Sequence, residues 1–192
     1  MTMPTLIANH QKKQTATQLK KVYSVLNQAF KMAEAEHGEY ENWTPISELN
    51  AEEYFNKYLK PYIKVLKLCN NYRECNYNNM SPWKFLNNEG CQAGIHTNNN
   101  SITFMMPDGT VILYMAFVNE GGYDTTHTIV DLNGPKGPNK FGRDVFRFDR
   151  EKGKGFVPTT SNTNYCSINS NGVGCAQKIM EDGWEIAPNY PW

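Results

Sequence analysis

Oxygen-bearing side chains gather in one glycine-rich stretch of the sequence. Asp131 and Asn133 are two residues apart, and Asn139 and Asp144 follow them. Carboxylate and amide oxygens are the hard ligands that Ca²⁺ prefers in proteins. The twelve-residue spacing and the final Glu of an EF-hand are absent, however. The stretch therefore predicts a turn held by Asx hydrogen bonds, and a calcium site at Asp131, Asn133 and Asp144 is the functional alternative.

Five cysteines offer two short local pairs. Cys166 and Cys175 bracket eight residues, and Cys69 and Cys75 bracket five. In the loop-entropy model, a disulfide that closes such a short loop contributes roughly 2–3 kcal/mol. The residues alone are equally compatible with reduced thiols in a cytosolic protein. Cys91 is then a buried thiol, an alternative partner of Cys75 or an intermolecular link.

The common enzyme motifs are missing from the sequence. It contains no Gly-x-Ser-x-Gly elbow, no His-Glu-x-x-His and no phosphate loop ending in Gly-Lys-Ser/Thr. The four histidines are scattered at spacings that build no zinc site. We therefore expect no enzyme activity. A thiol hydrolase that uses Cys91 and His127 stays open as an alternative, although any chain with five Cys and four His offers such a pair by chance.

The charges balance over the chain but are segregated along it. Lys plus Arg and Asp plus Glu both number 19, so no basic field exists to hold a polyanion and we expect no nucleic-acid partner. Residues 1–33 contain five Lys and no acid, whereas residues 34–56 contain seven Glu and no Lys or Arg. A basic helix thus runs into an acidic loop.

Hydrophobic periodicity predicts the first element that must position these groups. Between Gln11 and Ala35 the chain has no Gly or Pro, and apolar residues recur at three-and-four spacing. This pattern predicts an amphipathic helix that ends at Gly38. The helical face that we expect to be covered by strands consists of Leu19, Val22, Leu26 and Phe30.

A second helical stretch is predicted after the acidic loop. Asn50 and Glu53 have the spacing of a capping box. Pro61 interrupts the apolar face that follows, and the apolar residues after it are interpreted as a continuation of the helix to Cys69. Residues 69–100, rich in Asn, Gly and Cys with isolated aromatics, predict an irregular connection.

The period of the pattern changes to two at Ser101. The strands that it predicts are 101–106, 110–118, 126–132 and 144–150. The tripeptide Pro107-Asp108-Gly109 predicts a turn, and hence an antiparallel hairpin, between the first two. A short helix is predicted near residues 176–182. A long N-terminal α-helix followed by an antiparallel β-sheet of about four strands is the α+β pattern.

The length of 192 residues predicts a single domain. No apolar run of about 18 residues is present, so no membrane span or export signal is visible. The expected parts are the N-terminal helix (1–37), a helix and irregular connecting region (38–100), the antiparallel sheet (101–150) and a C-terminal loop region (151–192).

Both ends of the chain resemble type IV pilins and type II secretion pseudopilins. Met1-Thr2-Met3-Pro4-Thr5-Leu6-Ile7-Ala8-Asn9, followed by Leu19-Lys20-Lys21-Val22-Tyr23-Ser24, resembles the middle of that family's long first helix, with Pro4 as its proline. Val130-Asp131-Leu132-Asn133-Gly134, Gly142-Arg143-Asp144-Val145-Phe146 and the closing Gly183-Trp184 to Tyr190-Pro191-Trp192 resemble a bacterial pilin-like subfamily.

The resemblance implies a pilin-like fold with a disulfide-bearing C-terminal region. It implies a structural subunit of an extracellular or periplasmic filament, either a type IV pilus or a type II secretion pseudopilus. Because such proteins are exported, it also favours disulfides, at Cys69–Cys75 and Cys166–Cys175. No cofactor is required, and Ca²⁺ at Asp131 would hold the C-terminal loop rigid.

The partners that the resemblance implies are copies of the chain itself, other pilin-like subunits, a prepilin peptidase and an inner-membrane assembly platform. The expected location is the bacterial inner membrane before assembly and a periplasmic or cell-surface filament afterwards. The basic and acidic stretches could pair between subunits, with two solvated faces as the alternative.

One departure from the family pattern concerns the N-terminal side. The family's cleavage signal and membrane-embedded half-helix are not among these 192 residues, so we expect the chain to be the trimmed part of a longer protein and soluble by itself. A minor pilin that acts as an adhesin or a DNA-uptake binding module is the rival function on the same fold.

Overall fold

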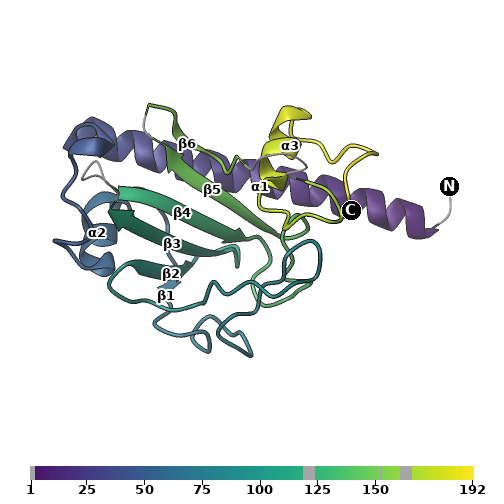
Figure 1. Cartoon of the computed structure of the whole chain (residues 1–192), viewed down its shortest axis with the longest axis horizontal. Helices are drawn as coiled ribbons and strands as arrows, with labels where there is room; N and C mark the ends of the chain where they lie inside the picture. The colour runs from purple at the N-terminus through teal and green to yellow at the C-terminus, as the bar shows by residue number, and fades with distance from the viewer. Residues whose placement is uncertain (1–2, 119–123, 152, 161–165) are drawn as a thin grey trace.

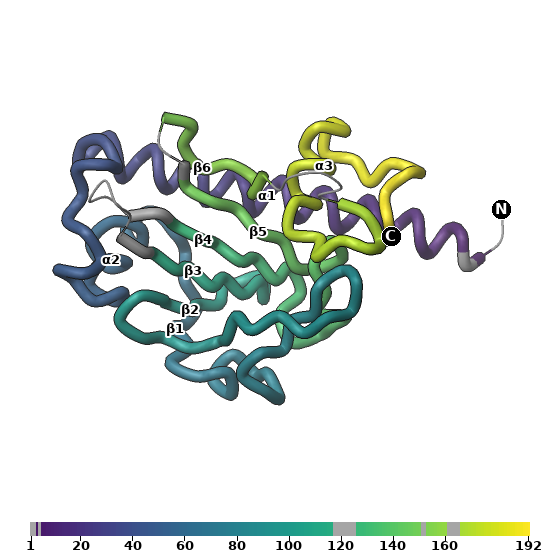
Figure 2. The backbone as a smooth tube through the Cα atoms, viewed as in Figure 1, coloured from purple at the N-terminus to yellow at the C-terminus, as the bar shows by residue number. Residues whose placement is uncertain are grey.

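A 35-residue helix, α1 (Met3–His37), lies along one face of a six-stranded antiparallel sheet (Figures 1 and 2). The computed structural model describes residues 3–118, 124–151, 153–160 and 166–192. The first two residues of the segment that resembles pilins therefore lie outside the described residues. Within those ranges, no helix has an apolar stretch of the length that a bilayer crossing requires.

α1 buries one stripe and ends at a glycine. The backbone N–H of Gly38 donates to the carbonyl oxygen of Glu34 at 2.9 Å, and Gly38 has a φ of +84°, which only glycine adopts without strain. The expected packing face is buried against the sheet: Leu19, Val22, Leu26 and Phe30 are at most 3% exposed. The helix thus forms one wall of the main core.

The sheet is a meander in which every strand pairs with its neighbours in sequence. Its order is β1-β2-β3-β4-β5-β6, and all pairings are antiparallel. The strands are β1 (Lys67–Leu68), β2 (Ser101–Met105), β3 (Val111–Val118), β4 (Asp124–Asp131), β5 (Val145–Glu151) and β6 (Gly155–Pro158). The four strands predicted from the period of two are the four central ones.

The expected count of about four strands is wrong, because two short edge strands complete the sheet. β1 pairs Lys67 with Met105, and two residues are too few to show a period. The predicted continuation of the second helix to Cys69 is also wrong, because the apolar residues after Pro61 lead into β1 and are too few to distinguish a strand from a helix. α2 (Ala51–Tyr58) and a 3₁₀ turn (Lys60–Tyr62) are followed by extended chain that pairs with β2.

Local capping behaves as the sequence predicts. The side chain of Asn50 accepts a hydrogen bond of 2.9 Å from the backbone N–H of Glu53 at the start of α2. Near the C-terminus, α3 (Cys175–Glu181) ends just before Gly183, at the predicted place.

The sheet has a core on each face. On the α1 face, the ring of Phe30 stacks on Phe156 at 5.2 Å between centroids. On the opposite face, the segment 69–100 covers the sheet with a second cluster that includes Trp83 and Ile95. The predicted irregular connection is therefore the lid of a second core.

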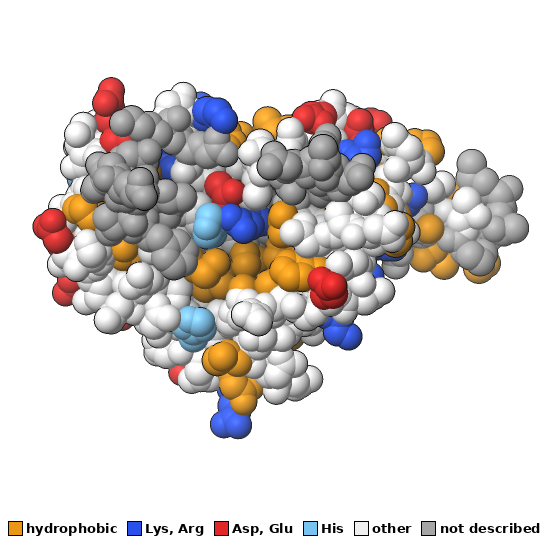
Figure 3. Space-filling model, in the orientation of Figure 1, with side chains coloured by type: hydrophobic (Ala, Val, Ile, Leu, Met, Phe, Trp, Pro, Cys, Tyr) orange, Lys and Arg blue, Asp and Glu red, His pale blue; other side chains and the backbone are white. Residues whose placement is uncertain are grey.

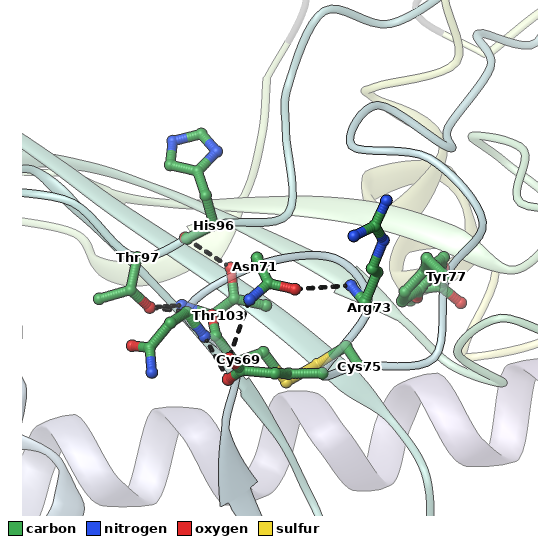
Figure 4. Close-up of a disulfide and its surroundings, with 11 residues drawn as sticks. Cys69, Asn71, Arg73, Cys75, Tyr77, His96, Thr97 and Thr103 are labelled. Carbon is green, nitrogen blue, oxygen red and sulfur yellow. Dashed lines mark hydrogen bonds between the residues drawn. A yellow bond between two sulfur atoms is a disulfide. The ribbon is translucent and has the colours of Figure 1, made fainter.

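The segment 69–100 is held to β2 beside a disulfide, as Figure 4 shows. Cys69 and Cys75 are bonded, and the backbone N–H of Cys69 donates to the carbonyl oxygen of Thr103. The hydroxyl of Thr97 donates to the carbonyl oxygen of Cys69, and the hydroxyl of Thr103 donates to that of His96. These bonds fix the start and the end of the lid to one strand.

An ion pair joins α1 to β5. The guanidinium of Arg150 contacts the carboxylate of Glu34, which is 116 residues away in sequence. The guanidinium carbon also lies 5.5 Å from the ring centroid of Phe30 and 4.6 Å from that of Tyr40. Because burial disfavours its charged form, the pKa of Arg150 falls to about 10. The half-buried Glu34 is therefore paired within its own chain, unlike the exposed acids that follow it.

Candidate functional site

Asp131 lies at the end of β4, where its carboxylate is turned into the second core. Its Oδ2 accepts hydrogen bonds from the Tyr77 hydroxyl at 2.7 Å and from Trp83 Nε1 at 2.8 Å. The residue is fully buried, and burial raises its pKa to about 7, with the negative charge of Asp144 adding to the shift. Asp131 thus anchors the 69–100 lid to the sheet.

Asp144 holds the loop between β4 and β5 in place. Its Oδ2 accepts from the backbone N–H of Asn139 at 2.9 Å, and its Oδ1 accepts from that of Lys140 at 2.8 Å. Its own carbonyl oxygen accepts from the backbone N–H of Leu132 at 2.9 Å. Burial raises the pKa of Asp144 above its ordinary value. These bonds are of the kind expected from an Asx-stabilised turn.

Three oxygens of the same loop are buried without a hydrogen-bond partner among the described residues. They are Asp131 Oδ1, Asn133 Oδ1 and Asn139 Oδ1. Buried polar atoms are ordinarily satisfied by protein, water or an ion. A set of one carboxylate and two amide oxygens is the chemistry that Ca²⁺ uses. The oxygen atoms that these residues offer are therefore of the type that Ca²⁺ binds.

The three predicted calcium ligands share one loop but do not all face one space. Asn133 and Asp144 line a cavity of about 360 Å³ between α1 and the C-terminal residue Trp192. Arg143, whose guanidinium carbon lies 5.0 Å from the Trp192 ring centroid, lines the same cavity. Asp131 lies instead between Tyr77 and Trp83. Across the described ranges, no group of three or more His, Cys, Asp or Glu side chains is placed to hold a metal.

Sequence reasoning missed Tyr77 and Trp83, the two partners of Asp131. They appear in the sequence as isolated aromatics in an irregular stretch, 54 and 48 residues before Asp131. Both carry a polar group that must find an acceptor when buried. The sequence could therefore have indicated that Tyr77 and Trp83 each need a hydrogen-bond acceptor, but not that this acceptor is Asp131.

The second predicted disulfide links the C-terminal region across a short loop. Cys166 is bonded to Cys175 at the start of α3. A Cβ atom on Gly142 would lie 2.9 Å from the sulfur of Cys175, so only glycine fits there. The Tyr190 hydroxyl donates to the carbonyl oxygen of Gly142 at 2.6 Å. The disulfide therefore packs α3 directly against the candidate calcium loop.

The fifth cysteine gives the thiol-hydrolase alternative no support. Cys91 is unbonded and 8% exposed, and burial raises the pKa of its thiol. A nucleophilic cysteine needs a lowered pKa and access to solvent. The ring of His127 lies 2.9 Å from Asp149 and also contacts Arg147.

The N-terminal part of α1 projects beyond the sheet (Figure 1). Its apolar side chains are exposed: Met3 by 76%, Leu6 by 53% and Ile7 by 55%. The buried stripe of the helix begins only at Ala16. Leu6 and Ile7 lie three and four residues after Met3, so the three exposed side chains share one side of the helix.

The family model described as "Family of unknown function (DUF6613)" matches residues 5–192, and the chain therefore belongs to this family. No curated protein and no solved structure matches the chain.

Proposed function

We propose that this protein is a pilin-like structural subunit of an extracellular or periplasmic filament, and that α1 is the element through which subunits assemble. The observation that carries the proposal is the asymmetry of α1. One stripe of its C-terminal two-thirds is buried on the sheet, whereas its N-terminal turns project with Met3, Leu6 and Ile7 exposed. A helix of 35 residues is about 52 Å long, which is more than the domain needs for its core.

The disulfides support an assembly site outside the cytoplasm. Both are local, they lie in the lid and in the C-terminal region, and they stiffen segments of low regular structure. Disulfides persist in oxidising compartments and are rare in the cytosol. The head domain of an exported filament subunit would meet these conditions.

The assembly role predicts that polar substitutions in the projecting turns prevent filament formation without unfolding the domain. In the variant Met3→Gln, Leu6→Gln, Ile7→Gln, we expect loss of filaments, because the apolar contact between subunits is removed. The free energy of unfolding should change by no more than about 0.5 kcal/mol, since all three side chains are exposed. Immunogold electron microscopy and the sheared surface fraction of cells that make the protein provide the measurement.

A matched control for this experiment is Leu66→Gln, Ile168→Gln, which removes two apolar side chains that are 60% and 57% exposed elsewhere on the domain. The control should assemble normally. Normal filaments from the triple variant would contradict the role of α1, and antibody labelling that never localises to filaments in the wild type would contradict the proposed function itself.

We further propose that the loop containing Asp131, Asn133 and Asp144 binds Ca²⁺ in the assembled or exported protein. The unpartnered buried oxygens of Asp131 and Asn133 support this proposal, and Asn139 of the same loop carries a third. Both carboxylate oxygens of Asp144 already accept backbone N–H groups, so Asp144 would bind the ion in addition to these bonds. Bound calcium would supply the positive charge that two buried, neighbouring carboxylates lack. It would thereby stiffen the loop against which the C-terminal disulfide packs.

Calcium is expected to raise the midpoint of thermal unfolding by about 5–10 °C when it is present at about 100 times its dissociation constant. Calorimetry in calcium and in chelator provides the measurement. Asp144→Asn should abolish the difference, and the exposed Glu89→Gln should preserve it. Equal midpoints of the wild type in calcium and in chelator would remove the calcium site.

A further inference from the structure

A groove with a basic rim lies beside α1. Its volume is about 640 Å³, and it lies between the N-terminal half of the helix and the C-terminal segment. We name it the basic groove and define it by Lys12, Lys13, Lys20, Trp184 and Ile186. Glu185 also lines it, so three ammonium groups face one carboxylate.

The lysines of the basic groove are available to a partner. Lys13 and Lys20 are exposed, and Lys12 Nζ lies 6.0 Å from the ring centroid of Trp192. Among the described residues, none of these three ammonium groups is within ion-pair distance of a carboxylate. By contrast, Lys21 is paired with Asp108 at 2.9 Å. The groove therefore combines uncompensated positive charge with the apolar surface of Trp184 and Ile186.

The opposite end of α1 carries the complementary charge. We name as the acidic collar the carboxylates in the last turn of α1, in the connection after it and in the first turn of α2: Glu36, Glu39, Glu41, Glu48, Glu52 and Glu53. Five of them are exposed and Glu41 is half-buried. Within the described part of the chain, none of the six forms an ion pair. Figure 3 shows acidic side chains at the end of the molecule that lies opposite to the N-terminus of α1.

We infer that the basic groove of one copy binds the acidic collar of a second copy, an inference that rests on the proposed assembly function. The two surfaces carry opposite charge, and neither is neutralised within its own chain. Because they lie at opposite ends of one helix, they cannot pair inside one copy. They also differ from each other, so the contact is heterologous and leaves one groove and one collar free at the ends of every assembly.

The helix sets the displacement between the two copies. The centre of the groove is near residue 16 and the collar begins at residue 36, a separation of 20 residues or about 30 Å at 1.5 Å per residue. If the two helices run parallel, a shift of about 30 Å along their axis brings groove and collar to one level. Repetition of this shift builds an open filament rather than a closed ring.

The same displacement brings the projecting N-terminal turns of one copy beside the middle of α1 in the other copy. A shift by 20 residues places Met3 to Ile7 of one copy level with residues 23–27 of the other. Near that level, an apolar groove of about 420 Å³ is lined by Val25, Met32 and Met106, and Met32 is 45% exposed. A single shift of about 30 Å along the helix axis therefore satisfies both the charged contact and the apolar contact.

Carbodiimide coupling tests this contact, because the reagent joins an amine to a carboxylate only when the two groups touch. Lys20 and Glu36, which are the closest groove–collar pair along the helix, are 16 residues apart, about 24 Å. A groove–collar link therefore arises between copies. The reaction is run on sheared filaments and on a concentrated one-to-one mixture of ¹⁴N- and ¹⁵N-labelled chains. We expect mixed-isotope peptides that join Lys13 or Lys20 to collar carboxylates.

Charge reversal provides the matched variants. Lys13→Glu, Lys20→Glu also removes the amines that carbodiimide would couple, so its effect is measured as self-association by sedimentation equilibrium. We expect the association constant to fall about tenfold, since two weak ion pairs become two repulsions. Lys60→Glu, Lys84→Glu makes the same charge change on exposed lysines elsewhere and should leave the association constant unchanged. Adding Glu39→Lys and Glu52→Lys to the groove variant should restore assembly. In this combined variant the links join the new lysines of the collar to the new glutamates of the groove.

The outcomes separate this contact from the assembly function. Filaments whose links avoid both groove and collar would overturn the contact and leave the proposed function standing. If no filaments form, the proposed function fails, and the concentrated chain still decides the contact: groove–collar links support it, and their absence overturns it. A groove variant whose self-association is as strong as that of the wild type would also overturn it.

Discussion

Replacing Phe30 with Ala is expected to lower the free energy of unfolding by about 3–5 kcal/mol. The side chain is 2% exposed, and its ring stacks on Phe156 and Trp43 and lies 6.2 Å from Tyr114. The same ring underlies the guanidinium of Arg150. Removing it therefore leaves a cavity where α1, β3, β5 and β6 meet and takes away the support of the ion pair with Glu34.

Equilibrium unfolding in urea measures the effect of Phe30→Ala. Met32→Ala is the matched control, because Met32 lies two residues further along the same helix with 45% of its surface exposed. Met32→Ala should lower the free energy of unfolding by less than about 1 kcal/mol. A Phe30→Ala variant as stable as the Met32→Ala variant would show that α1 does not depend on this face for its docking.

Replacing Asp131 with Ala is expected to cost about 3–5 kcal/mol near pH 5.5. The Tyr77 hydroxyl and the Trp83 indole N–H would lose their shared acceptor in a buried site, and each unsatisfied donor costs about 1–3 kcal/mol. Asp131→Asn retains an acceptor oxygen of the same shape and should cost much less. Unfolding is measured with chelator present, so that the result reports the hydrogen bonds alone.

The pH dependence of the wild type gives an independent measure of Asp131. Burial raises its folded-state pKa from 3.8 to about 7, so the folded protein binds a proton more tightly than the unfolded chain. The stabilisation from this proton is fully present below pH 3.8 and is lost as the pH rises through about 7. Asp131→Asn should flatten this part of the profile. An unchanged slope in the variant would contradict the buried position of the carboxylate.

The proposed assembly surfaces lie on the same helix that stabilises the fold. The buried stripe of α1 begins at Ala16, whereas the side chains of Met3, Leu6 and Ile7 near its N-terminus are exposed. In the proposal, one element serves both the core of its own chain and the contact with a second copy.

Local signals determined much of the fold. The three-and-four spacing of α1, the cap at Asn50, the turn at Pro107-Asp108-Gly109 and the four central strands all depend on residues near one another in sequence. The two disulfides join residues 6 and 9 apart, which made both pairs candidates, and the resemblance to exported proteins then favoured their oxidation. Such features need no knowledge of the remainder of the molecule.

Tertiary structure alone decided which buried groups meet. Glu34 belongs to a stretch of acids with no signal to distinguish it, and only the docking of α1 on β5 brings it to Arg150. Asp131 resembles a loop ligand in sequence, yet the lid delivers Tyr77 and Trp83 to its carboxylate from about 50 residues away. The sequence by itself determined the long helix, the four central strands and their buried faces, because periodicity and capping act over a few residues. The partners of its buried charges were decided by the tertiary structure, because desolvation and hydrogen bonding act between whichever groups the packing brings within reach.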